Sequence, residues 1–352
     1  MVKASELDWN EFETSWDFER LGILMTGIES LESSYNAWVA KNRDTIAEAK
    51  QFEEENNRLF IDAYGLADEI TPDVPIEQIT LTVNPAYRYG GTLTEEEQWT
   101  RFRNDTMTEL VSYAIGCMMG RYSLDASGLI YAHSGNVSFD ASRYTTFPVD
   151  PDGIVPLTDD EWFNDDVCHR LIEFMSVAWD KTRLEDNLAF LADNFSPKKN
   201  ESSRETLRRY LCDSFFKDHL QTYKKRPIYW LFSSGKEKAF QCLIYMHRYN
   251  EGTLARMRTE YVIPLQGMMA SRVRRLEEDI AAAASTAHRM RLEKQRATLV
   301  KQQSELREFD EKLRHYADQR ISLDLDDGVK VNYSRFGDLL AEVKAITGAK
   351  AD

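Results

Sequence analysis

The sequence contains little cysteine and no long apolar run. Its four cysteines, Cys117, Cys168, Cys212 and Cys242, form no CxxC pair, so neither a zinc ribbon nor a redox dithiol is supported. Dispersed cysteine suits a reducing cytoplasm, which is the expected location. No stretch approaches the roughly eighteen uninterrupted apolar residues of a membrane span, and the acidic N-terminus lacks the apolar segment of a secretory signal. We therefore expect no membrane partner.

The side-chain arrangements that carry catalysis are also missing. The six histidines are dispersed, and Cys242 and His247 do not have the three- or four-residue spacing of metal ligands on one helix face. No Ser-His-Asp or Cys-His arrangement follows from the spacing. Gly235-Lys236 resembles the end of a phosphate-binding P-loop, but Trp230 occupies the position of the first glycine of that motif. We expect no catalytic, cofactor-binding or metal-binding residues in this chain.

Charge is distributed unevenly along the chain, whose formal net charge is −15. Residues 1–197 contain 14 Lys and Arg against 37 Asp and Glu, whereas residues 198–258 contain 14 basic and 6 acidic residues. Residues 259–352 hold 16 of each. Because binding to nucleic-acid phosphates needs clustered Lys and Arg, only the middle segment keeps that function open. The acidic first part is expected to face protein partners, or a basic surface of domains outside this chain, and to repel nonspecific DNA.

Hydrophobic spacing predicts a mostly α-helical (α+β) fold with long helices, a coiled-coil segment and short strands. Apolar residues recur at helical spacing from about Ser30 to Gly65, which indicates a long amphipathic helix. Leucines at seven-residue spacing predict a coiled-coil helix over 272–320, roughly 70 Å long if straight. A phase shift near the alanine run 281–284 leaves a stutter or a helical hairpin open. Shorter elements are expected as strands at 79–83 and 227–232, a helix at 237–250, and a short strand and turn at 322–333.

Changes in composition divide the chain into four segments. These are an aromatic strap and long acidic helix at 1–75, an acidic mixed α/β region at 76–197, a basic mixed segment at 198–262, and the coiled-coil helix with a C-terminal cap at 263–352. The strap carries four large aromatic side chains between Trp9 and Phe18. We expect it to dock on something else, such as a part of the protein outside this chain.

One tetrapeptide, Asn84-Pro85-Ala86-Tyr87, resembles the NPPY loop of N6-adenine DNA methyltransferases. In that loop the Asn side chain and a Pro carbonyl accept hydrogen bonds from the amino group of a flipped adenine. Such a site also needs a glycine-rich turn that binds S-adenosylmethionine. The 83 residues before Asn84 contain no GxG, and position 86 is Ala. A turn at the end of a strand is therefore the favoured interpretation.

A basic run and a Ser/Gly turn supply the candidate DNA-binding residues. The turn is expected to open a helix whose free N–H groups could contact a phosphate, with simple helix capping as the alternative. The basic run could equally be a solvated face. The candidates are Lys224, Lys225, Arg226, Ser233, Ser234, Gly235, Lys236 and Lys238.

Six segments spread along essentially the whole chain form a more specific pattern, at 13–18, 79–85, 112–124, 226–236, 244–249 and 325–333. They resemble the C-terminal region of PglX, the adenine-specific DNA methyltransferase of BREX phage-defence systems. In that family the cofactor motif and the NPPY loop lie in an earlier methyltransferase domain. The resemblance implies a fragment or a separately encoded homologue, with S-adenosylmethionine bound in the missing upstream domain and none in this chain.

Together these observations predict a DNA-gripping, target-recognition or assembly module of a BREX-type adenine-N6 methyltransferase, without a catalytic core of its own. The expected partners are double-stranded DNA, the upstream methyltransferase domain and other BREX proteins. The alternative is a protein-interaction scaffold that recruits BREX components without touching DNA. A DNA mimic is a third possibility that acidity and helices suit, although the basic segment counts against it.

Overall fold

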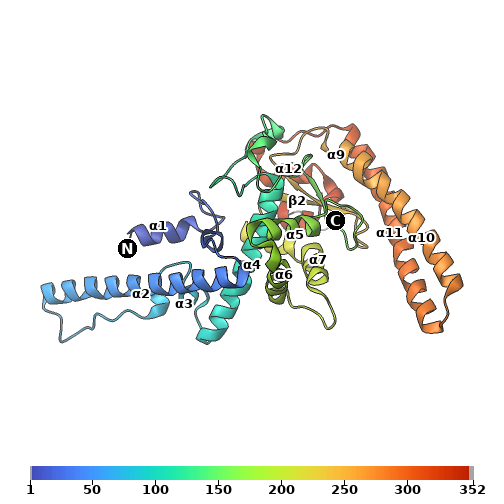
Figure 1. Ribbon diagram of the computed structural model, residues 1–352. Coiled ribbons are helices and arrows are strands. Elements are labelled where there is room, and N and C mark those ends of the chain that lie inside the picture. The colour runs from blue at the N-terminus through green and yellow to red at the C-terminus, as the bar shows by residue number, and fades with distance from the viewer. Residues whose placement is uncertain (1, 349–352) are drawn as a thin grey trace. The chain divides into compact units, whose positions relative to one another are not determined.

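The computed structural model describes residues 2–348, and its chain divides into two compact units. Unit 1 comprises Met1–Gly116, Tyr122–Ile130 and Leu171–Thr206, and unit 2 comprises Cys117–Arg121, Tyr131–Arg170 and Leu207–Asp352. Unit 1 carries 14 Lys and Arg against 31 Asp and Glu, a net −17, whereas unit 2 carries 30 against 28. The expected mostly α-helical fold with some β structure is confirmed (Figure 1).

Helices form most of the core of unit 1, which also contains buried residues outside helices, such as Phe18 and Leu81. Trp38 stacks on Phe102 with ring centroids 5.4 Å apart, and Tyr113 stacks on Tyr122 at 5.3 Å. None of the described helices of the chain is long and apolar enough to cross a membrane. The helices that contribute to unit 1 are α1 (Val2–Asn10), α2 (Leu31–Tyr64), α3 (Pro85–Tyr89), most of α4 (Glu95–Met119), the end of α5 (Val167–Ala178), α6 (Leu184–Ala192) and the start of α7 (Ser203–Asp213).

The long amphipathic helix expected near residues 30–65 is confirmed as α2. The Ser30 hydroxyl accepts a hydrogen bond from the Ser33 amide and so caps the first turn. At the other end Gly65 adopts the left-handed conformation (φ 67°), which lets the chain leave the helix without steric cost.

The strand expected at 79–83 is wrong. Ile79, Leu81 and Val83 are buried alternately, as in a strand, but no strand in the described part of the chain pairs with them. The amides of Thr82 and Val83 instead donate to the Asp8 carboxylate of α1, at 2.7 and 2.9 Å. Burial raises the pKa of Asp8, although these two backbone hydrogen bonds oppose that effect.

The N-terminal aromatic strap docks, in part, on unit 1 itself. The Trp38 indole donates to the Glu11 carboxylate at 2.8 Å, and Phe18 packs edge-on against Tyr122. The Glu19 amide donates to the Asn10 carbonyl, which closes residues 10–19 into a loop. Trp16 lies within this loop, and its side chain is 98% exposed.

Unit 2 is built around an antiparallel sheet with the strand order β1-β3-β2. The strands are β1 (Ile154–Pro156), β2 (Tyr229–Ser233) and β3 (Gln241–Tyr245), and Trp230 lies opposite Ile244. The expected strand near 227–232 is confirmed as β2. The helices wholly within this unit are α8 (Phe215–Thr222), α9 (Thr253–Arg256), α10 (Ile263–Ala282), α11 (Thr286–Asp318), α12 (Gly328–Ser334) and α13 (Val343–Thr347), and α9 passes into α10 through a π-helical turn (Met257–Val262).

Two segments of unit 2 form a different type of secondary structure from the one expected. The helix expected at 237–250 is wrong, because these residues form β3 and its flanking turns. All five residues of β3 are buried, and periodicity alone cannot separate a short strand buried on both faces from a buried helix. Of the short strand and turn expected at 322–333, the strand is wrong, since these residues form a 3₁₀ turn and α12.

Of the two interruptions left open for the long helix expected over 272–320, the structure confirms the helical hairpin near the alanine run. Helices α10 and α11 pack side by side as two antiparallel arms (Figure 1). The chain turns where Ala283 becomes extended (ψ 121°), and the Ser285 hydroxyl then accepts from the His288 amide to cap α11. The leucines at seven-residue spacing on α11 are buried, which fits packing within unit 2.

Candidate nucleic-acid interface

The three consecutive cations of the basic run lie in the loop between α8 and β2, residues 223–228, which we call the cationic loop. The side chains of Lys224, Lys225 and Arg226 are exposed and form no ion pair with any described residue. Lys224 and Lys225 adopt left-handed backbone conformations, with φ of 49° and 62°. The Lys225 amide donates to the Leu220 carbonyl at 2.7 Å, so the turn is tied back to α8.

A buried histidine that the sequence did not single out fastens this loop. His219 Nε2 accepts hydrogen bonds from the amides of Ile228 at 3.1 Å and Tyr229 at 3.2 Å. Its ring stacks on Tyr229, with centroids 4.9 Å apart. Burial, assisted by the charge of Arg121, lowers the pKa of His219 to about 3, so the ring is neutral and Nε2 remains an acceptor.

The sequence offered only a weak signal for His219. It stands among the apolar residues Phe215, Phe216 and Leu220 on α8, as many core histidines do. Its partners are backbone amides, whose positions no side-chain pattern reveals.

The Ser/Gly turn does bind an anion, but the anion is a carboxylate of the same chain. Glu305 of α11 accepts from the Ser234 hydroxyl at 2.6 Å and from the amides of Glu237 at 2.6 Å and Ala239 at 3.1 Å. A Cβ atom at Gly235 would lie 2.9 Å from Glu305 Oε2, and Gly235 has φ of 141°, so glycine is needed here. Ser233 donates nothing to this carboxylate; its hydroxyl accepts from Gln241.

The turn connects β2 to β3 instead of opening a helix, which corrects the expected helix N-terminus. The amides of Glu237 and Ala239 already donate to Glu305, so a phosphate could bind these two N–H groups only by displacing that carboxylate. Of its two lysines, Lys236 is exposed and has no ion pair among the described residues. Lys238 donates to the Cys212 carbonyl and pairs with Asp213 at 2.5 Å.

The structure therefore separates the eight candidates into two groups. The cationic loop precedes β2 and the Ser/Gly turn follows it, so the five residues of β2, roughly 17 Å of extended chain, lie between them. Another cation of the basic segment is structural: Arg208 pairs at 2.5 Å with Asp166, whose side chain is fully buried. Of the eight candidates, only the cationic loop and Lys236 present cations that are exposed and free of ion pairs with the described residues.

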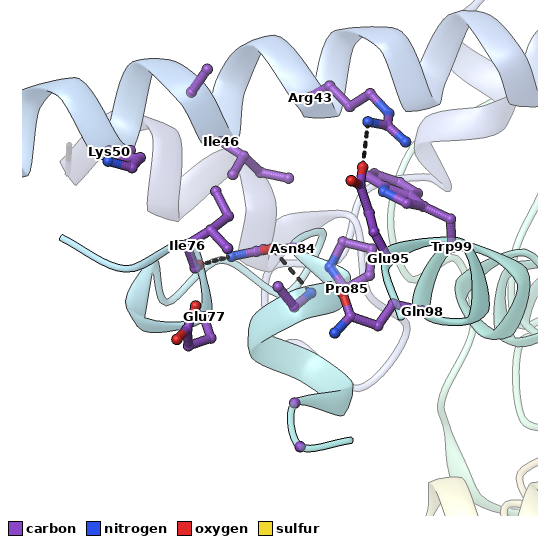
Figure 2. Close-up of a pocket in the computed structure, with 14 residues that line it drawn as sticks. Arg43, Ile46, Lys50, Ile76, Glu77, Asn84, Pro85, Glu95, Gln98 and Trp99 are labelled. Atoms are coloured by element: carbon purple, nitrogen blue, oxygen red, sulfur yellow. Dashed lines mark hydrogen bonds and ion pairs between the residues drawn. The ribbon is translucent and has the colours of Figure 1, made fainter. Parts of the chain in front are cut away.

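Asn84 caps α3 and the rest of the tetrapeptide forms its start. The side-chain amide of Asn84 hydrogen-bonds to backbone groups (Figure 2). Asn84 Nδ2 donates to the carbonyls of Ile76 at 2.7 Å and Ile79 at 2.9 Å, and Oδ1 accepts from the Ala86 amide. Both amide hydrogens are used, so the side chain serves as a helix cap. The expected turn at the end of a strand is wrong, because the segment is the capped first turn of a helix and no strand precedes it among the described residues.

A cavity of about 630 Å³ adjoins this cap, between α2, α3 and α4 (Figure 2). Its aromatic wall is Trp99, but the Arg43 guanidinium lies 4.3 Å from the indole centroid and pairs with Glu95 at 2.9 Å. The chain's own cation therefore covers one indole face. Nowhere within residues 2–348 do three or more His, Cys, Asp or Glu side chains gather as a metal site would require.

Two neighbouring carboxylates, Asp150 and Asp152, lie in a turn of unit 2. Burial, followed by the charge of Asp152, raises the pKa of Asp150 to about 7. The Arg248 guanidinium donates to the carbonyls of Asp150 at 2.6 Å and Pro151 at 3.0 Å, which fixes the turn. These hydrogen bonds explain why Arg248 is buried, and no bound ligand is needed to explain it.

These features define a mostly α-helical module with a small sheet and a cationic loop that hydrogen bonds tie back to α8. Comparison with known proteins gives its relatives. Over 99% of its length the chain is 49% identical to the adenine-specific methyltransferase BrxX of Escherichia coli O9:H4 (strain HS). It is also 38% identical, again over 99% of its length, to the adenine-specific methyltransferase PglX of Lacticaseibacillus casei (strain Zhang).

The resemblance inferred from the six sequence segments is thereby confirmed. The matched region is 29% of the first relative and 28% of the second, so the chain spans under a third of the length of these proteins. A search against protein-family profiles gives no match.

Proposed function

We propose that this chain is a DNA-contacting module of an adenine-specific DNA methyltransferase of the BREX type. In this proposal the cationic loop of unit 2 meets the phosphate backbone, and S-adenosylmethionine is bound by another part of the enzyme. The observation that carries the proposal is the set of three exposed cations, free of ion pairs with the described residues, on a loop whose backbone is hydrogen-bonded to α8. Fixing the loop backbone in advance reduces the conformational entropy that is lost when its cations bind phosphates.

The charge of the two units supports the same assignment. Unit 1, at a net −17, would be repelled by DNA, whereas unit 2 is close to neutral and can offer a locally basic surface. The two matched relatives are both adenine-specific methyltransferases. A module without an assembled catalytic site could serve such an enzyme by positioning the duplex.

Fluorescence anisotropy of a labelled duplex of about 25 base pairs tests this proposal. We expect affinity to fall steeply between low and near-physiological salt. Replacing Lys224, Lys225 and Arg226 by Glu should abolish binding, and replacing them by Gln should reduce the salt slope by about 0.9 for each phosphate that the loop no longer neutralises. The matched control replaces Lys181, Lys330 and Lys344 by Glu, which are exposed lysines with no ion pair among the described residues.

An equal fall in affinity for the loop variant and the control would indicate a general charge effect and would contradict the proposal, as would no binding at low salt. For the cofactor, isothermal titration calorimetry should detect no S-adenosylmethionine binding by this chain. Micromolar affinity would show that the chain holds a cofactor site of its own.

The second candidate is an assembly scaffold that touches no DNA. The exposed Trp16 favours it, because a large aromatic side chain left 98% in solvent is typical of an interface anchor. Pull-down of the other BREX proteins by this chain, abolished by Trp16→Ser, combined with no DNA affinity, would make the scaffold the better account.

A further inference from the structure

The two halves of α2 differ in what covers them. In the first part of the helix, residues 31–49, the side chains of Tyr35, Trp38, Asn42, Ile46 and Ala49 are buried. In the remaining part, residues 50–64, which we call the second half, Ile61 is the only buried residue. In Figure 1 the second half extends beyond α1, accompanied by the segment that returns from its end.

The returning segment covers only one side of that half. The Asn57 side chain donates to the Pro72 carbonyl at 3.2 Å, and the Val74 amide donates to Glu54 at 3.2 Å. These contacts and Ile61 mark a single helical face, since residues 54, 57 and 61 are three and four positions apart.

The other side of the second half presents large apolar side chains to solvent. Phe52, Leu59 and Phe60 are 43%, 66% and 58% exposed. Phe52 and Leu59 follow Trp38 by two and three heptads, and Phe60 follows Ile46 by two, so they continue the stripe that is buried in the first half. We define these three residues as the α2 apolar face; adjacent exposed apolar side chains of this size are typical of interaction sites.

A cavity of about 310 Å³ between α1 and α2 lies next to this face. Leu7, Ala49, Phe52 and Val83 form its apolar walls, and Asn42 lies at its edge. The Nδ2 atom of Asn42 is buried and has no hydrogen-bond partner among the described residues. A buried amide without a partner is costly, and a docked segment that brings a carbonyl could satisfy it.

We propose that the α2 apolar face and this cavity dock a basic, apolar-striped segment of the methyltransferase polypeptide that lies outside the matched region in the relatives. The charge of the surroundings selects such a segment, because Glu48, Glu53, Glu55 and Asp62 border the face and form no ion pair among the described residues. More than two-thirds of each relative lies outside the match. This inference rests on the proposed place of the chain in a methyltransferase, but not on DNA binding by unit 2.

Binding in trans tests the inference. The probe is the part of the E. coli relative outside the match, purified as a separate, folded polypeptide, and biolayer interferometry measures its affinity for this chain. Leu59→Ser/Phe60→Ser should weaken binding at least tenfold, as is common for interface anchors. The control, Met290→Ser/Val300→Ser on α11, removes apolar side chains that are 65% and 47% exposed and should leave binding unchanged.

Hydrogen exchange gives a second measurement that does not depend on the variants. Adding the probe should slow amide exchange in residues 50–64 of α2. No binding by the unaltered chain, full binding by the α2 variant, or dimerisation of the chain through this face in light scattering would each overturn the inference. The same α2 variant should keep its DNA affinity in the anisotropy assay, so failure here is distinguishable from failure of the DNA proposal.

Discussion

Replacing His219 by Gln tests whether a neutral, buried histidine holds the cationic loop. The Gln side chain can offer Oε1 to the amides of Ile228 and Tyr229 in place of Nε2, but it does not titrate. His219 has a pKa lowered to about 3 in the folded chain, against 6.5 as its ordinary value. The folded state therefore stays neutral while the unfolded state takes up a proton below about pH 6.5.

The contribution of His219 to the free energy of unfolding is therefore fully present above pH 6.5 and is lost as the pH falls toward 3. Between pH 7.5 and pH 5.5 the loss is about 1.4 kcal/mol. Over this range protonation of the histidine stabilises the unfolded state by the equivalent of about one pKa unit, while the folded state stays neutral. His247, whose pKa is lowered to about 4 by burial, and Asp150 also respond to pH, but they contribute equally to both proteins. The difference in stability between the unaltered chain and His219→Gln should therefore shrink by about 1.4 kcal/mol on acidification.

Urea unfolding followed by circular dichroism at the two pH values measures this difference. Hydrogen exchange of the amides of Ile228 and Tyr229 provides the local readout, since both should exchange faster in His219→Ala than in His219→Gln. A stability difference that does not change with pH would refute the reasoning, because it would mean that His219 has an ordinary pKa in the folded chain.

Three further substitutions probe other contacts of unit 2. Gly235→Ala places a Cβ atom against Glu305 at a positive φ and should cost about 1–3 kcal/mol in urea unfolding; an unchanged midpoint would mean that the turn can relax. Arg208→Met leaves the Asp166 carboxylate buried without its partner and should cost about 3–5 kcal/mol in the same assay, more than Arg208→Lys; equal losses would show that the charge is unimportant. Asp150→Asn mimics the protonated carboxyl, which is favoured because the pKa of Asp150 is raised to about 7. Stability from Asp150 is greatest below pH 4 and is lost as the pH rises through 7, so the variant should lose less stability than the unaltered chain between pH 5 and pH 8 in thermal unfolding; parallel losses would contradict the raised pKa.

Elements set by local pattern could be predicted from the sequence, and those set by distant contacts could not. Helix α2 was predictable because its apolar period extends over many turns and ends at a glycine. The hairpin of α10 and α11 remained ambiguous because alanines favour helix and give no sign that the chain turns at 283–285. Strand β3 was missed since an uninterrupted buried run has neither the helical nor the strand period.

The candidate site shows the same division. The exposed cations of the cationic loop were predictable from composition alone, whereas His219 and its backbone partners were not. The anion-binding character of the Ser/Gly turn was also predictable. Its occupant was not, because Glu305 lies about seventy residues further along the chain and reaches the turn only after α11 has packed on unit 2.

The pairing of Gly235 with Glu305 has a consequence for variation among related chains. A side chain at 235 and a glutamate at 305 compete for the same space, so a change at one position alters which residues the other tolerates. A related chain that carries a larger residue at 235 should have a shorter one at 305, and its turn would then have unoccupied N–H groups. In such a chain, an external phosphate could occupy the turn that the carboxylate fills here, so these two positions together indicate whether the turn is closed or available.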